Sequence, residues 1–179
     1  MMEVELEWPK KEFPEDARDR LREKGKEMGI WQPNLPKEVG GAGLSCLAAM
    51  VMNEEFSYSI VRPSLSSGLG ANFLLNCEES VKDKYLKKLV DGDIVSCFAQ
   101  TEPGGGTDVA GISTFAEKVG DEYVLNGRKT FISSGHEADI AFVVAVTDKA
   151  KGTHGGISMF VVDCHQPGWK VVRRIHTMG

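Results

Sequence analysis

Three consecutive glycines follow a strand-like run in the middle of this chain, and they constrain its fold more than any other feature. The run from Val95 to Gln100 ends at a Thr-Glu-Pro turn, glycines occupy 104–106, and Thr107 and Asp108 close the stretch. Glycine lacks a Cβ, so successive backbone N–H groups can approach one anion, and a neighbouring hydroxyl adds a donor. The stretch therefore suits either a tight turn, which is the commoner use of a glycine run, or a phosphate site.

The two best-known nucleotide motifs do not fit these glycines. No Lys-Ser or Lys-Thr pair follows them, as a Walker loop requires. Val109 stands where a Rossmann fingerprint counted from Gly104 needs its third glycine. A nucleotide bound here would therefore be held by a different arrangement.

Composition narrows the class of protein. The chain has 179 residues, of which 41% are hydrophobic, enough for one or two small domains with a packed core. No apolar run approaches the ~18 residues of a membrane helix, and the N-terminal segment is charged, so no membrane contact or signal segment is predicted. The net charge of −5 without a basic block gives no footprint for nucleic acid.

The spacing of cysteines and histidines predicts neither a disulfide framework nor a metal site. Four cysteines are widely spaced with no C-x-x-C pair, which favours reduced thiols in a cytoplasmic protein. The four histidines show no zinc-type spacing. We therefore expect a cytoplasmic protein without a metal.

The first half of the chain shows the apolar period of helices. Gly29 ends the first helical pattern, Ser45 is the N-cap of the second, and Ser80 opens a capping-box-like sequence that starts the last. Apolar side chains that share a face are Ala17, Leu21 and Met28 in the first helix and Leu47, Ala48, Val51, Met52 and Phe56 in the second. Helices are thus predicted from Phe13 to Met28, from Ser45 to Phe56, within Ser59–Asn76, and from Ser80 to Asp91.

From Val95 onward the apolar period changes to two and turn signals recur, which is typical of strands. Asn126-Gly127 is the strongest hairpin signal, since both central residues of a type I′ turn need positive φ, and it predicts that YVL pairs with RKTFIS. Further strands are predicted at Ile140–Val146, Gly156–Val162 and Gly168–Arg173. We place a domain boundary at about residue 93.

Two motifs, taken together, resemble a known family. FAQTEPGGGTD, from Phe98, and GDEYVLNGRKTFISSG, from Gly120 to Gly135, resemble the middle β-domain of the flavin-dependent acyl-CoA dehydrogenases in order and separation. LPKEVGGAGLS and NEEFS upstream and GISMFVVD downstream extend the resemblance over nearly the whole chain. The resemblance implies a multi-domain α+β fold. Its helical N-terminal domain would span 1–93, with the first family helix largely absent, and an incomplete antiparallel β-barrel would span 94–179.

The resemblance also implies a reaction. Such enzymes remove a proton from the α-carbon of an acyl-CoA thioester and pass hydride from the β-carbon to the N5 atom of FAD. Expected partners are the acyl-CoA substrate of fatty acid β-oxidation and an electron-transfer flavoprotein as electron acceptor. The full-length family forms homo-oligomers, usually tetramers, so we expect a homo-oligomer.

Roles for single residues follow from the same resemblance. Thr101 and the backbone around Gln100 would donate to the N1 and O2 atoms of the flavin, with Phe98 along the ring edge. Gly106 and Thr107 would contact the pyrophosphate, and Thr107 would also border the acyl-CoA chain.

The second motif would supply the other flavin contacts. Phe131 stands where the family commonly has tryptophan, Ser133 stands where a threonine hydroxyl reaches N5, and Ile132 lies between them. Taken without the resemblance, Phe131 suits a core aromatic and Ser133 a polar turn. The carboxylates of Glu102 and Asp108 would repel a phosphate, so we expect them to brace the turn and to take no catalytic role.

No catalytic residue is predicted in this chain. The family's glutamate base lies in a C-terminal helical bundle that would follow Gly179, so the 179-residue chain alone is expected to be inactive even with FAD. Helices without that bundle would expose apolar side chains such as Leu47, Val51 and Phe56, which favours association. The alternative hypothesis is a non-catalytic protein that uses the same scaffold to bind a ligand or partner.

Overall fold

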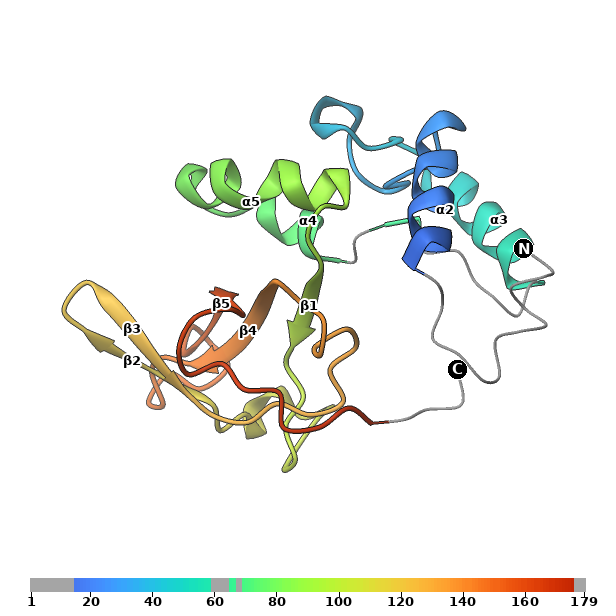
Figure 1. The fold of residues 1–179 in the computed structure, drawn as a ribbon. Coiled ribbons are helices and arrows are strands. Elements are labelled where there is room, and N and C mark those ends of the chain that lie inside the picture. The colour runs from blue at the N-terminus through green and yellow to red at the C-terminus, as the bar shows by residue number, and fades with distance from the viewer. Residues whose placement is uncertain (1–14, 59–64, 67–68, 176–179) are drawn as a thin grey trace. The chain divides into compact units, whose positions relative to one another are not determined.

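The computed structural model describes residues 15–58, 65–66 and 69–175 (Figure 1). These residues divide into two compact units, with the main boundary between Asp93 and Ile94 and with Leu69 and Gly70 grouped with the second unit. We call them the helical unit and the sheet unit, and each is described by itself. None of the helices in the described ranges is long and apolar enough to cross a membrane.

The helical elements come first along the chain. Their order and bounds are α2 (Glu15–Glu27), the 3-10 turn η2 (Lys37–Val39), α3 (Cys46–Ser57), α4 (Gly70–Leu74) and α5 (Glu79–Asp91). Ser45 is the N-cap of α3, as predicted, because its hydroxyl accepts the backbone N–H of Ala48 at 3.2 Å. Within Ser59–Asn76, where a helix was predicted, residues 59–64 and 67–68 lie outside the described chain, and α4 is the helix seen in the described part.

Two helix boundaries differ from the predictions. Helix α5 begins at Glu79 after the extended residue Glu78, which makes no side-chain cap, so the capping box predicted at Ser80 is wrong. Helix α2 ends at Glu27, and Met28 is 61% exposed. Because Gly29 turns the chain with φ +66°, Met28 does not share the buried face of Ala17.

Three side chains from the first part of the chain hold the C-terminal end of α5. The last carbonyls of a helix have no intrahelical partner and need other donors. The indole N–H of Trp31 donates to the Val90 carbonyl at 2.7 Å, and the Gln32 amide donates to the Leu89 carbonyl at 3.2 Å. A guanidinium N–H of Arg22 donates to the Gly92 carbonyl at 3.0 Å. These bonds fasten α2 and the segment after it to α5.

Helix α3 leaves much of its apolar surface open. Leu47 and Val51 are 71% and 52% exposed, as predicted, whereas Phe56 is half-buried. The buried residue of this helix is Ala49, which was not among the predicted face residues.

The strands are organised around β4 (Figure 1). They are β1 (Ser96–Ala99), β2 (Phe115–Val119), β3 (Glu122–Asn126), β4 (Ile140–Val146) and β5 (Ile157–Asp163). Strand β4 is buried along its whole length, which explains its uninterrupted apolar sequence. It pairs antiparallel with β5 and parallel with β1, and β2 pairs antiparallel with β3. The helical domain followed by an incomplete barrel is therefore confirmed, and the sheet is not closed. The sheet is mixed and not antiparallel as predicted, because β1 and β2 both pair in parallel with β4.

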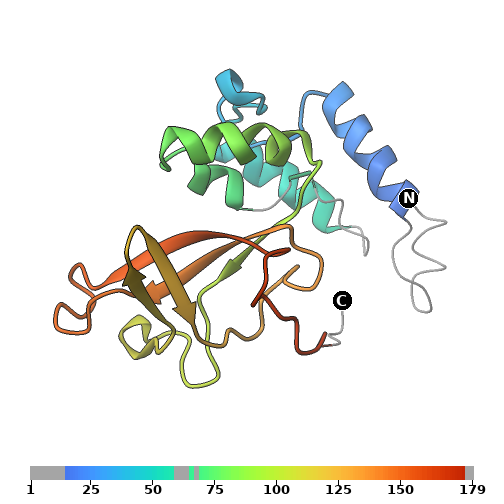
Figure 2. The ribbon, with the colours of Figure 1, turned by 60° about the vertical axis from the view of Figure 1, so that its left-hand side comes forward.

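Strands β1 and β2 behave as one strand interrupted by a loop. Strand β1 lies parallel to the first part of β4, and Phe115 of β2 pairs in parallel with Val146 at the other end of β4. The chain from Gln100 to Thr114 leaves the sheet between them and returns where the Val146 N–H donates to the Thr114 carbonyl at 2.8 Å. Figure 2 shows this loop in yellow-green. The glycine run lies within it.

Two strand predictions are wrong. The hairpin turn lies at Gly120-Asp121, where Gly120 has φ +63°, and Asn126 is the last residue of β3, opposite Phe115. Gly127 has a different purpose, since a Cβ added there would lie 2.6 Å from the Cβ of Thr114. The predicted strands at 128–133 and 168–173 are absent from the described chain, and Gly168 turns the chain with φ +98°.

Substitution of Gly92 tests the packing at the end of α5. Gly92 has φ +81°, and an added Cβ would lie 2.8 Å from Arg22 Cδ and 2.9 Å from Trp31 Cζ2. Gly92→Ala should therefore lower the free energy of unfolding by about 1–2 kcal/mol for the left-handed backbone and about 1–3 kcal/mol for overpacking. Gly29→Ala is the matched control, because Gly29 has φ +66° and open space around it. Equal losses for the two variants in urea unfolding would contradict this packing.

Candidate functional site

The glycine loop exposes its backbone. A small turn closes it, in which the Glu102 N–H donates to the Gly105 carbonyl at 2.9 Å and the Gly105 N–H donates back at 3.1 Å. Gly104 and Gly106 are exposed, and a Cβ added at Gly104 would meet no atom within 4 Å. The N–H groups of Gly106 and Thr107 have no hydrogen-bond partner in the described part of the chain. The loop thus offers unpaired N–H donors on exposed residues, as an anion site requires.

The Glu102 carboxylate holds the start of the loop to its end. It is 5% exposed and accepts the backbone N–H groups of Ser113 and Thr114 at 2.8 and 2.9 Å. The hydroxyls of the same two residues donate to it as well. A carboxylate that accepts several donors is stable in its charged form even when buried. Glu102 therefore braces the loop, as predicted.

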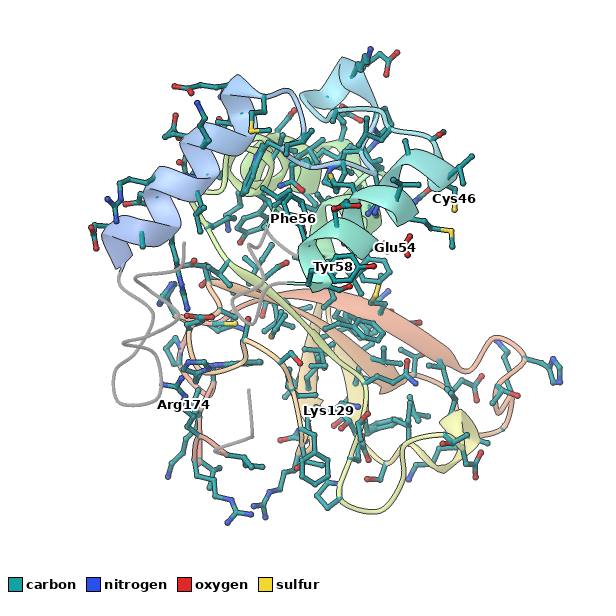
Figure 3. The ribbon with its side chains drawn as sticks, turned by 90° about the vertical axis from the view of Figure 1, so that its right-hand side faces the viewer. Cys46, Glu54, Phe56, Tyr58, Lys129 and Arg174 are labelled. Carbon is teal, nitrogen blue, oxygen red and sulfur yellow. The ribbon has the colours of Figure 1, made fainter. Side chains whose placement is uncertain are left out.

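Lys129 completes the set of donors to Glu102. Its ammonium group lies 2.8 Å from Glu102 Oε1 and 2.8 Å from the Gln100 carbonyl, and its side chain is 10% exposed. Figure 3 labels Lys129 among the side chains of the sheet unit. A buried ion pair is favourable only when further hydrogen bonds satisfy its members, and this pair meets that condition. We call Glu102 and Lys129 the buried ion pair.

This ion pair brings two predicted flavin-facing segments together. The Thr130 N–H donates to the Thr101 carbonyl at 3.0 Å, one residue from the contact between Lys129 and Gln100. Residues 100–101 and 129–130 are thus neighbours, although they are far apart in the sequence.

The predicted site residues differ in exposure. Gln100 and Thr101 are half-buried, and Thr107 is exposed beside the glycines. Phe98 is half-buried on β1, where it pairs in register with Phe142 of β4.

Among the predicted site residues of the second motif, Phe131 and Ser133 are exposed. Ile132 is half-buried and packs against the core cluster that contains Cys97 and Ala141, so a ligand there would meet its backbone. Phe131 has φ +58° and its side chain is 75% exposed. Positive φ is uncommon for a bulky side chain and is strained, and such residues cluster at functional sites. Phe131 is not the core aromatic that the sequence alone would allow.

Asp108 has a local structural role. Its Oδ1 atom accepts the N–H of Ala110 at 3.0 Å and caps the 3-10 turn η3 (Val109–Gly111). The prediction that both carboxylates of this stretch brace the backbone is therefore confirmed. Within the described ranges, no group of three or more His, Cys, Asp and Glu residues could hold a metal ion.

Sequence reasoning missed three members of this site. Lys129, Ser113 and Thr114 received no role, because their contacts with Glu102 join residues that are far apart in the sequence. One signal was available: a buried carboxylate beside an anion site needs a cation, and Lys129 lies within the second motif. The close approach of Gly127 to Thr114 was hidden, because Asn-Gly was interpreted as a turn.

Two family models match this chain. The model described as acyl-CoA dehydrogenase, N-terminal domain, matches residues 1–93, which are more than half of the 179 residues. The model described as acyl-CoA dehydrogenase, middle domain, matches residues 97–179. The chain belongs to the acyl-CoA dehydrogenase family.

Curated members of the acyl-CoA dehydrogenase family are similar to it along most of its length. Caffeyl-CoA reductase-Etf complex subunit CarC of Acetobacterium woodii is 38% identical over 173 residues, 94% of this chain and 44% of that protein. 3-(Aryl)acrylate reductase of Clostridium sporogenes is 41% identical over 162 residues, 88% of this chain and 42% of that protein. The chain thus spans less than half the length of these two relatives.

A solved structure of the family supports the fold. The glutaryl-CoA dehydrogenase of Mycobacterium smegmatis in complex with FADH2 has a TM-score of 0.70 and 30% sequence identity to this chain. The similarity covers 84% of this chain and 38% of that one.

The ionised state of Glu102 predicts how stability depends on pH. Burial opposes ionisation, but hydrogen bonds from Lys129, Ser113 and Thr114 outweigh it and hold the pKa of Glu102 well below its usual range. Because the folded pKa is lowered, Glu102 adds stability above the unfolded carboxyl pKa of about 4.3, and that stability is lost as pH falls below it.

Glu102→Gln should lower the free energy of unfolding at pH 7 by about 3–5 kcal/mol, since it leaves Lys129 without its counter-charge. The difference from the unsubstituted protein should narrow as pH falls from 5 to 3. Glu117→Gln, at an exposed position of β2, is the control and should change little at any pH. Urea unfolding at several pH values measures this. A difference that stays constant from pH 7 to pH 3 would show that the Glu102 charge does not stabilise the fold.

Proposed function

We propose that this chain carries the FAD-contacting face of an enzyme that oxidises an acyl-CoA thioester to the α,β-unsaturated product. One observation carries the proposal. The hydroxyls of Thr101, Thr107 and Ser133 have no hydrogen-bond partner in the described part of the chain. Thr101 and Ser133 lie on the two segments that the buried ion pair brings together, and Thr107 lies on the glycine loop between β1 and β2. Free donors on a braced scaffold suit a ligand rich in acceptors.

The residues present fit FAD. The exposed glycine loop with the N–H groups of Gly106 and Thr107 suits a pyrophosphate, and the Thr101 N–H and hydroxyl suit the pyrimidine edge of the flavin. The exposed Phe131 suits an aromatic contact with the ring, and Ser133 suits a hydrogen bond to it. Bound FAD would supply the hydride acceptor. FADH2 in the similar glutaryl-CoA dehydrogenase structure supports this choice of cofactor.

We assign the residues of the glycine loop to orienting the reactants and not to abstracting the proton. Both carboxylates of the loop are occupied, Glu102 with five donors and Asp108 with the N–H of Ala110. Glu102 is therefore not free to take the α-proton of a thioester, and Asp108 serves to cap the η3 turn. We therefore assign Thr101, Thr107 and Ser133 to binding and assign no base among the loop carboxylates.

The substrate and partners are proposed from the relatives. The names of the two curated relatives describe reductases. Reduction of an α,β-unsaturated product is the reverse of the proposed oxidation, and it moves the same hydride from flavin to carbon. The Etf complex in the name of the Acetobacterium relative supports an electron-transfer flavoprotein as electron partner. The exposed Leu47 and Val51 of α3 support a homo-oligomer.

Substitution of two donors tests the proposal. Thr101→Ala and Ser133→Ala, made in the native protein that contains this chain, should each weaken FAD binding about 10- to 150-fold, the effect of losing about 1.5–3 kcal/mol. Thr153→Ala, at an exposed position between β4 and β5, is the control. Quenching of FAD fluorescence measures the affinity, and bleaching by an acyl-CoA tests turnover.

Unchanged FAD affinity in both Thr101→Ala and Ser133→Ala would show that the flavin does not bind at this face. FAD binding that depends on these residues, without bleaching by any acyl-CoA tested, would instead favour the binding-protein hypothesis.

A further inference from the structure

The buried ion pair is electrically neutral and adjoins the backbone of residues 100–101, which are among the proposed flavin contacts. The Lys129 ammonium donates a hydrogen bond to the Gln100 carbonyl at 2.8 Å. The N–H of the next residue, Thr130, donates to the Thr101 carbonyl at 3.0 Å. The side chains of Glu102 and Lys129 are only 3% and 10% exposed. Charges buried to this extent are weakly screened by solvent. A net charge on this pair would therefore change the electrostatic potential at residues 100–101.

Each member of the pair keeps other partners when the second is removed. Without Lys129, Glu102 still accepts two N–H groups and two hydroxyls from Ser113 and Thr114. Without the Glu102 charge, Lys129 still donates to the Gln100 carbonyl. The local backbone therefore has enough bonds to persist in either single variant, while the net charge changes by one unit in opposite directions.

A flavin bound at this face gains negative charge near its N1 and O2 atoms when it is reduced. The positive charge of Lys129, left unbalanced near the flavin, stabilises the reduced form. The negative charge of Glu102, left unbalanced there, destabilises it. If the pair only braced the backbone, replacing either member would loosen the same loop. The two replacements would then not shift the flavin potential in opposite directions.

We propose that Glu102 and Lys129 are positioning residues that also set the reduction potential of a flavin bound at residues 100–101, because together they leave no net charge there. This inference rests on the proposed function, because it requires a flavin against residues 100–101. It assigns to the charges of Glu102 and Lys129 an electrostatic effect on the reduced flavin. Neither residue touches the flavin itself.

The test compares four variants of the native protein that contains this chain. Glu102→Gln should raise the midpoint potential of the bound flavin, and Lys129→Met should lower it. Two further variants leave the pair neutral: Lys129→Arg keeps the positive charge, and the double variant Glu102→Gln/Lys129→Met removes both charges. Their midpoint potentials should both stay near that of the unsubstituted protein. Lys170→Met, at an exposed position of the sheet unit, is the control for a surface charge. Equilibration with redox dyes measures the potentials.

A second readout needs no flavin. In thermal unfolding of the flavin-free protein, each single charge-removing variant should melt earlier, and the double variant should lose less than the sum of the two. If Lys129→Met does not fold, Lys129→Gln keeps two donors and replaces it in both measurements.

Shifts of opposite sign, cancelled in the double variant, would support the inference. Shifts of the same sign, or none, in a protein that binds FAD would overturn the inference and leave the proposed function standing. An unsubstituted protein that binds no FAD would overturn the proposed function itself, and the inference with it.

Discussion

The buried carboxylate of Glu102 is the interaction on which the sheet unit depends. Strands β1 and β2 use the same edge of β4, and the chain between them must leave the sheet and return to it. Glycines 104–106 carry no side chains that could hold such a loop in one conformation. Glu102 supplies the missing constraint, because it binds the two residues at which the loop returns and the lysine that follows β3. One side chain thus fixes the glycine loop and the segment that follows β3 together.

This arrangement separates two groups of polar residues. Glu102 and Lys129 face inward, where a buried charge is tolerated only if it is fully hydrogen-bonded, and the structure gives both of them several partners. The hydroxyls of Thr101, Thr107 and Ser133 make no such bonds within the described chain. The inward group therefore accounts for stability, and the other group is available for a ligand. The strained and exposed Phe131 belongs with the second group.

Local sequence signals predicted what depends on local physics. The continuous apolar run of Ile140–Val146 predicted the buried strand β4, and the hydroxyl of Ser45 predicted the start of α3. Contacts between distant residues were not predictable in this way. Lys129 and Glu102 are 27 residues apart, and Trp31 and Val90 are 59 apart, so no pattern in a short window pairs them. The hairpin turn predicted at Asn126-Gly127 is wrong, because glycine suits a close contact as well as a positive φ. Here Gly127 is needed for its close contact with Thr114.

Hydrogen exchange of single backbone amides, with and without FAD, tests the central claim most directly. The amides of Ser113 and Thr114, bound to Glu102, should be protected in both states, whereas those of Thr101, Gly106 and Thr107 should become protected only when FAD is bound. Rapid exchange of Ser113 and Thr114 in both states, or protection by FAD that bypasses the glycine loop, would contradict the claim that Glu102 holds this loop ready for the cofactor.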